Sequence, residues 1–252
     1  MPENGKDVEK LTNNNRLKMK KITILILMVF GYFSNAIALE GVNLGVSLTA
    51  GVFSVDGAKE EFKGQHAGVG SPGDVSKSNG SDGDEAEGLF GIGSIFAEYE
   101  VNDAVTFGID YVPHSLDSET TENVQADMTT SSSSSNKTNT VQVDGEDMTT
   151  LYAILTPPDA NGAYIKVGYM QVDIITNENL GTGGAYPNTD LDGYTLGVGY
   201  NLDVDNGAFV RIEANYMELD GATVTNSNDS TKSVTVDGIE GYGARVSIGK
   251  SF

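Results

Sequence analysis

The chain has 252 residues, a net charge of −21, 38% hydrophobic residues, 31 glycines and no Cys. This length suits one barrel or one to two ordinary domains, and the absence of Cys excludes a disulfide framework and thiolate chemistry. A chain this acidic repels nucleic acid, so we expect no partner of that class.

The beginning of the chain has the pattern of a secretory signal. Lysines within 18–21 precede an apolar stretch at 22–33, which is too short to span a membrane comfortably. Ala36-Ile-Ala38 then supplies the small residues of a signal-peptidase site. We therefore expect residues 1–38 to be a signal peptide region, with translation starting at Met19 and cleavage after Ala38. A retained amino-terminal anchor is the alternative.

The mature domain, 39–252, alternates apolar residues with small or polar ones, which is the pattern of strands with two unlike faces. In the first strand, Val46 and Leu48 share one face, while Gly45 and Ser47 share the other. No apolar stretch in this domain is long enough for a transmembrane helix. The pattern predicts eight strands, over 42–53, 95–101, 105–111, 148–156, 163–170, 195–202, 210–217 and 241–252.

The strand at 148–156 has an ambiguous parity. Leu151, Ala153 and Leu155 compete with Tyr152 and Ile154 for the outward face. We favour the first set.

The connections between these strands alternate between long and short. Long loops are expected at 55–88, 113–147, 174–192 and 220–237, where periodicity is lost and polar residues dominate, as in Ser131 to Ser135. An up-and-down meander places the three short turns at one rim and the four long loops at the other, as in outer-membrane barrels. The even strand number then leaves both mature termini at the short-turn rim.

A soluble lipocalin-like barrel has the same periodicity with its apolar face inward. Three features favour the membrane instead. The polar face is rich in Gly, Ser and Thr, which suits a crowded interior, and the loops are longer than a soluble meander needs. Tyrosines near the strand ends are typical of interfacial aromatic belts; they are Tyr99, Tyr111, Tyr169, Tyr200 and Tyr216.

Four stretches carry a family resemblance: Tyr99–Asp103, Gly193–Tyr200, Phe209–Tyr216 and the terminal Gly241–Phe252. Through them the chain resembles the eight-stranded outer-membrane β-barrel family, which includes OmpA/OmpX-like barrels and opacity-type surface proteins. The resemblance implies an all-β, antiparallel transmembrane β-barrel in a Gram-negative outer membrane, in contact with lipid and lipopolysaccharide, with both mature termini periplasmic. It also implies a structural or surface-interaction role.

The terminal strand resembles the family's assembly signal, which the outer-membrane insertion machinery reads. Lys250 departs from that signal, because many such signals have an aromatic residue at this position. The residues that match are Tyr242, Ala244, Val246, Ile248 and Phe252.

Seven charged residues fall on the inward parity. They are Glu98, Glu100, Asp110, Lys166, Arg211, Glu213 and Arg245. Interior charges must be paired or hydrated, and the interior of an eight-stranded barrel is just filled by side chains. We therefore expect an ion-pair network that plugs the lumen; a narrow porin-like channel for small solutes or ions is the alternative.

Acidic stretches at 82–87, 190–192 and 203–205 carry the oxygen ligands that divalent cations prefer. None matches the spacing of a calcium loop, so we predict solvated charge, no metal site and no cofactor. Divalent cations that bridge acidic loops to lipopolysaccharide phosphates are a further hypothesis.

A third function, lipid A modification, is the chemistry of some barrels of this kind that carry a His–Ser pair at the outer rim. His114 and Ser115 lie at a suitable height, but adjacent strand residues point to opposite faces and are poorly placed for proton transfer. His66 has no evident partner. We expect no enzyme.

Overall fold

The computed structural model describes residues 40–55, 58–62, 86–130, 133–181, 184–228, 230, 232–236 and 238–252. The expected signal peptide at 1–38 lies outside the described residues, as do His66 and most of the first long connection. Gly41–Phe252 forms one compact unit. Among the described residues, no helix has the length and apolar character needed to cross a membrane.

Eight antiparallel strands form the wall of a closed barrel. Going round the barrel, β4 pairs with β3, then come β1, β13, β10, β9, β8 and β7, and β7 pairs with β4 again. The predicted eight-stranded antiparallel barrel is therefore confirmed. The wall strands are β1 (Val42–Val55), β3 (Ala86–Asn102), β4 (Val105–Tyr111), β7 (Ser133–Leu155), β8 (Ala163–Leu180), β9 (Thr189–Asp203), β10 (Ala208–Leu219) and β13 (Ile239–Ser251).

The two faces of the wall differ as the alternation predicts. On the outside, Val46 lies opposite Ile248 and Leu48 opposite Val246 across the β1–β13 pair, and all four side chains are exposed. On the inside, Ser47 and Ser247 are buried and their hydroxyl oxygens lie 3.0 Å apart. The apolar face is therefore the outer face of the barrel.

The ambiguous strand also faces as favoured. Leu151 and Leu155 are exposed, whereas Tyr152 and Ile154 are buried in the interior. The large ring of Tyr152 fits inside the barrel only because the residue beside it is small. That residue is Gly108, which lies directly opposite Tyr152 on β4.

Inward aromatic rings lie over inward glycines of neighbouring strands. A Cβ added at Gly45 would lie 2.3 Å from the Phe96 ring, and one added at Gly249 would lie 2.2 Å from the Phe209 ring. Tyr164 covers Gly199 in the same way. The glycines on the polar face therefore provide the space that lets large rings lie flat against the inside of the wall.

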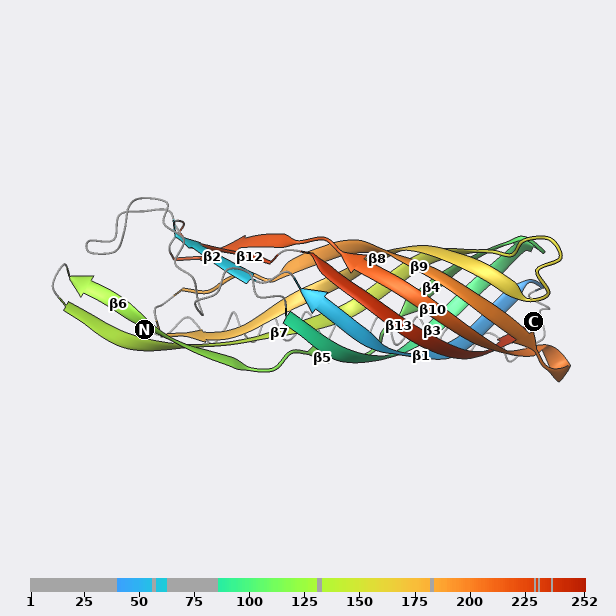
Figure 1. Cartoon of the computed structure of the whole chain (residues 1–252), viewed down its shortest axis with the longest axis horizontal. Helices are drawn as coiled ribbons and strands as arrows, with labels where there is room; N and C mark the ends of the chain where they lie inside the picture. Colours follow the sequence, from blue (N-terminus) through green and yellow to red (C-terminus); the bar gives the residue numbers. More distant parts are fainter. Residues whose placement is uncertain are drawn as a thin grey trace. The chain divides into compact units, whose positions relative to one another are not determined.

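The expectation that the long connections are irregular loops is wrong for much of their length. In the stretch 113–147, β5 (Leu116–Asp117) and β6 (Thr121–Thr130) pair with the outer half of β7, and β8 continues alongside β7 as far as Leu180. Figure 1 shows this ribbon extending from the barrel at the end opposite the C-terminus. Paired backbones satisfy their own polar groups, and the Thr and Val residues in these stretches favour strands.

The last long connection also contains strands. β11 (Ala222–Thr225) and β12 (Lys232–Val236) form a small sheet with β2 (Ala58–Phe62) from the first connection.

The short connections form tight turns. Asn102 Oδ1 accepts a hydrogen bond from the Ala104 amide at 2.9 Å between β3 and β4. Asn161, before β8, and Asn206, in the 3-10 turn Asp205–Gly207, both have positive φ angles, which Asn tolerates better than most residues. These three turns lie at one rim, as the meander predicts.

The ring-over-glycine packing makes a first prediction. Gly199→Ala places a methyl group 2.4 Å from the Tyr164 ring, so the ring must move, and we expect a loss of about 1–3 kcal/mol in the free energy of unfolding. Urea unfolding of the protein in detergent micelles measures this. Gly91→Ala is the matched control, because a Cβ there meets no atom within 4 Å. Equal midpoints for the two variants would contradict this account.

Candidate functional site

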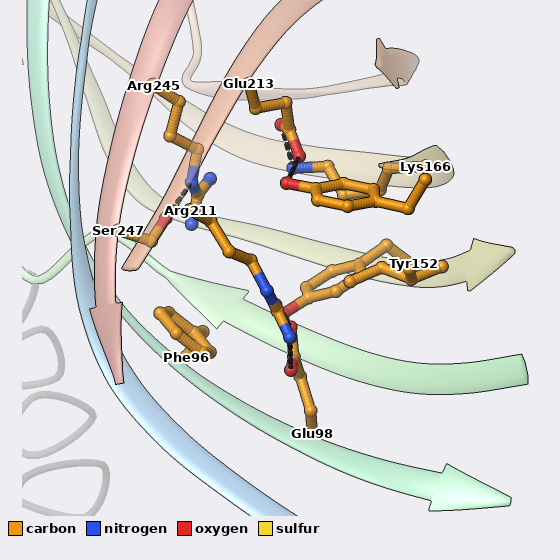
Figure 2. Close-up of a pocket in the computed structure, with 10 residues that line it drawn as sticks. Phe96, Glu98, Tyr152, Lys166, Arg211, Glu213, Arg245 and Ser247 are labelled. Carbon is orange, nitrogen blue, oxygen red and sulfur yellow. Dashed lines mark hydrogen bonds and ion pairs between the residues drawn. The ribbon is translucent and has the colours of Figure 1, made fainter. Parts of the chain in front are cut away.

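Three buried ion pairs occupy the barrel interior. Arg211 binds Glu98 through two contacts, Nη1 to Oε1 at 2.5 Å and Nη2 to Oε2 at 2.9 Å. Lys166 pairs with Glu213, and Arg245 pairs with Asp110. Figure 2 shows Arg211 reaching Glu98 while Lys166 meets Glu213. The structure therefore brings six of the seven inward charges together as three neutral pairs.

Each pair joins strands that are not neighbours in the wall. Arg211 on β10 and Glu98 on β3 are separated by β13 and β1. Arg245 on β13 and Asp110 on β4 are separated by β1 and β3, and Lys166 on β8 and Glu213 on β10 by β9. The pairs therefore cross the lumen, and they fill the cross-section of the barrel.

Neutral donors complete the hydrogen bonding of these carboxylates. The Tyr152 hydroxyl donates to Glu98 Oε1 at 2.8 Å, and the Tyr164 hydroxyl donates to Glu213 Oε2 at 2.9 Å. Ser94 Oγ donates to Asp110 Oδ2 at 3.0 Å. A buried carboxylate is stable only when its lone pairs find such partners, so the two tyrosines belong to the network.

These two tyrosines were not among the residues predicted for the site. Their signal was available, because Tyr164 shares the inward parity of Lys166. Glu100 was assigned to the network but lies elsewhere. It is exposed near the short-turn rim, where Asn43 Nδ2 donates to its Oε1 at 2.7 Å.

The alternation of the sequence predicted a polar interior, but part of the interior is apolar. At the long-loop end, seven buried apolar side chains pack together: Ile92, Val112, Met148, Met170, Val172, Leu191 and Leu219. They come from β3, β7, β8, β9 and β10, and from the residue after β4. The lumen therefore has two layers, the charged layer toward the short turns and this apolar layer toward the long loops.

Two small cavities border the charged layer. One of about 10 Å³ lies among Phe96, Tyr164 and Arg211, and one of about 30 Å³ lies between Asp110 and Met170. A water molecule needs roughly 10–15 Å³ of such space. Each cavity therefore has room for one or two water molecules, and neither is wide enough for a hydrated solute.

Two aromatic belts surround the outer face. Near the long-loop rim, Tyr194, Tyr216 and Tyr242 form a row with ring centroids 6.0 and 5.1 Å apart, and Tyr169 pairs with Tyr194 in register. Near the short-turn rim, Tyr99, Phe107, Tyr200 and Phe252 are exposed. The wall between the belts is apolar, with Leu48, Val198 and Ile212 among its exposed side chains.

The terminal strand closes the barrel. β13 pairs with β1 along 13 residue pairs, and the Phe252 amide donates to the Val42 carbonyl at 3.0 Å. Four of its five predicted signal residues, all except Ala244, are large and exposed on the outer face. Lys250 Nζ lies 5.5 Å from the centre of the Phe252 ring. The amine therefore lies over the ring of the terminal aromatic residue, two positions after it in the sequence.

The predicted acidic stretches are dispersed. Residues 82–85 lie outside the described part of the chain, Asp190 is exposed, and Asp203 Oδ1 accepts from Asn201 Nδ2 at 2.6 Å within its turn. Among the described residues, no three acidic or His side chains are grouped in a way that could hold a metal ion.

Glu146, an acidic residue on the long-loop side, lies in an environment that disfavours its charged form. Partial burial raises the pKa of Glu146 on β7, and the neighbouring charges of Asp147 and Asp144 raise it further. The neutral form of Glu146 is therefore favoured relative to that of a solvated carboxyl group.

The His114 and Ser115 side chains have separate partners. His114 Nε2 accepts a hydrogen bond from the Gly93 amide at 3.1 Å, and Ser115 Oγ donates to Asp117. The structure therefore does not bring the imidazole and this hydroxyl together.

The closed eight-stranded wall, its apolar exterior between two aromatic belts and its paired interior charges define a class of protein, the transmembrane-type β-barrel. No family model and no curated protein matches the sequence.

Solved structures with a related architecture include the outer membrane protein AlkL, determined in lipid bilayers, at 12% identity and a TM-score of 0.45 over 86% of this chain and 93% of that one. Neisserial surface protein A is 15% identical with a TM-score of 0.37 over 84% and 98% of the two chains. The outer membrane protein OprG from Pseudomonas aeruginosa is 11% identical with a TM-score of 0.37 over 84% and 97%.

The buried pairs make a second prediction. Lys166→Met leaves Glu213 charged and without its cation, so we expect a loss of about 3–5 kcal/mol in unfolding free energy. The double variant Lys166→Met with Glu213→Gln keeps the acceptor for Tyr164 and removes the lone charge, so it should recover most of that loss. Urea unfolding in micelles measures both, with Lys250→Met, at an exposed position, as a control that changes little. A double variant no more stable than the single one would refute the pairing.

Proposed function

We propose that this chain is an integral protein of a Gram-negative outer membrane, with a structural or surface-interaction role and a lumen closed by its own side chains. The observation that carries the proposal is that the apolar and charged side chains are placed in the reverse of their arrangement in a soluble protein. Exposed Val, Leu and Ile side chains cover the outside, while Glu98, Arg211 and Glu213 lie inside. In water such an exterior aggregates, whereas in a bilayer it contacts acyl chains.

The proposed orientation places both mature termini in the periplasm and the strand extensions outside the cell. Two features support it. The short turns and the terminal strand share one rim, and short turns are periplasmic in this class of barrel. The opposite rim carries the β6–β7–β8 ribbon and the small β2–β11–β12 sheet, whose sequences are mostly polar and which extend beyond the wall where other molecules can contact them.

The partners follow from this placement. The outer face contacts membrane lipid and lipopolysaccharide, with divalent cations bridging lipopolysaccharide phosphates to carboxylates such as Glu218, which accepts a hydrogen bond from the Tyr216 hydroxyl at 2.6 Å at the long-loop belt. The insertion machinery reads the outer face of β13, through Tyr242, Val246, Ile248 and Phe252. The role is non-enzymatic, which fits the separate partners of His114 and Ser115.

A membrane-facing exterior makes a third prediction. Val198 lies on the outer face between the two belts, so Val198→Arg should destabilise the protein folded in lipid vesicles by about 2–4 kcal/mol. Val204 is comparably exposed but belongs to the short turn after β9, so Val204→Arg should have little effect. Urea titration in vesicles compares the two. Equal effects of both changes, or a wild-type chain that folds in plain buffer, would overturn the proposal.

The closed lumen makes a fourth prediction, measured as conductance in planar bilayers. The wild-type protein should show no steady channels, because the ion pairs and the apolar layer block the passage. Removing the Glu98–Arg211 bridge with alanine at both positions should allow current through the charged layer in brief steps when the apolar layer fluctuates. Steady wild-type channels that disappear on changing Arg211 or Glu213 would instead establish the porin-like function.

A further inference from the structure

The barrel wall has a break in its pairing near the long-loop rim. β3 and β4 pair from Asn102 and Val105 up to Ile95 and Tyr111, where the pairing ends. β3 itself continues to Ala86, and among the described strands this stretch, 86–94, has β1 as its only partner. We call the boundary between residues 86–94 and the chain after Tyr111 the seam.

The chain on the other side of the seam stays with β7. The Val112 amide donates to the Met148 carbonyl at 3.0 Å, and Leu116 on β5 lies in register with Gly145 on β7. Pro113, between these two contacts, has no amide to donate to a neighbouring strand. The next residue, His114, reaches β3 with its side chain, and its Nε2 lies 3.1 Å from the Gly93 amide nitrogen.

His114 bridges the seam in one protonation state. Its Nε2 accepts from the Gly93 amide at 3.1 Å, which requires a free lone pair on that nitrogen. The ring proton is then on Nδ1, which lies 3.0 Å from the Ser115 carbonyl oxygen and donates to it. Both hydrogen bonds therefore form together only when the imidazole is neutral and its proton is on Nδ1.

We propose that His114 is a protonation-controlled latch, which holds Gly93 of β3 to the chain after β4 when neutral and releases it when the ring takes up a second proton. An imidazolium has two N–H donors and no acceptor, so the Gly93 amide loses its partner. Imidazole is the side chain whose charge changes between about pH 5 and 8. The seam therefore loosens when His114 takes up that proton.

The elements around the latch favour this release. The charged side chains on its own segment and on the adjoining part of β7 are carboxylates: Asp117, Asp144, Glu146 and Asp147. The outward positions of β3 and β1 beside Gly93 are Gly91, Ile95 and Leu48, which carry no charge. The charge of a protonated ring is therefore attracted toward its own segment and β7, and no charged side chain on β3 or β1 holds it beside Gly93.

The opening is local, because the inside of the seam is held separately. Ile92 on β3 and Val112 after β4 belong to the same buried apolar layer, which does not depend on pH. His114 itself is exposed. Release of the latch should thus free the outer edge of β3 without unfolding the barrel.

Amide hydrogen exchange by NMR tests the latch, with the isotope-labelled protein in detergent micelles at about pH 5 and about pH 7.5. After correction for the intrinsic pH dependence of exchange, the protection factor of the Gly93 amide should fall roughly fivefold or more at the lower pH, which corresponds to losing one hydrogen bond. The Val198 amide, in the middle of the wall, should keep its protection.

Two variants separate the latch from a general effect of acid. His114→Gln keeps an acceptor oxygen at every pH, so Gly93 should stay protected at both. His114→Ala has no acceptor, so Gly93 should be poorly protected at both, with the urea midpoint unchanged. Equal Gly93 protection in wild type at both pH values would overturn the proposal. So would nitrogen chemical shifts that place the neutral ring's proton on Nε2.

Discussion

The pairing of β13 with β1 is the contact on which the rest of the structure depends. A backbone inside a bilayer has no water to satisfy its amides and carbonyls, so a sheet there must close on itself. Closure fixes which face of each strand is enclosed, and the enclosed face is then too narrow for anything but its own side chains. The ion pairs, the rings over glycines and the apolar layer are three ways of filling that enclosed space.

Much of this arrangement could be predicted from the sequence, because a strand has a period of two residues. Parity placed Leu48 and Val198 on one face and Lys166, Arg211 and Glu213 on the other. The small residues of the polar face, the long connections and the tyrosines near the strand ends then assigned the apolar face to the outside. Parity did not give the height of Glu100, which lies at the rim. It also did not give the partner of each charge, because every pair joins strands that are separated by one or two others in the wall. Those distances depend on the diameter and stagger of the barrel, which no local pattern encodes.

The strands that extend beyond the wall were not predicted, because their sequence lacks the two-residue period that identified the wall strands. The sequence over 121–146 is mostly polar and shows no alternation of apolar and polar residues that distinguishes a strand from a loop. Backbone pairing alone keeps β6, β7 and β8 together beyond the wall. The apolar layer was missed because its members, such as Ile92 and Met170, interrupt a polar face at single positions. Only their convergence from several strands at one height makes them a layer.

The contact between Ser47 and Ser247 joins positions 200 residues apart in the chain. Such a contact closes a loop of nearly the whole barrel sequence, so it forms late in folding and has a large loop-entropy cost. Before closure, β1 and β13 each have an edge without hydrogen-bonding partners and an apolar face that is not yet enclosed or covered. Both features promote association between chains, so the rate of closure decides how much of the protein folds and how much aggregates.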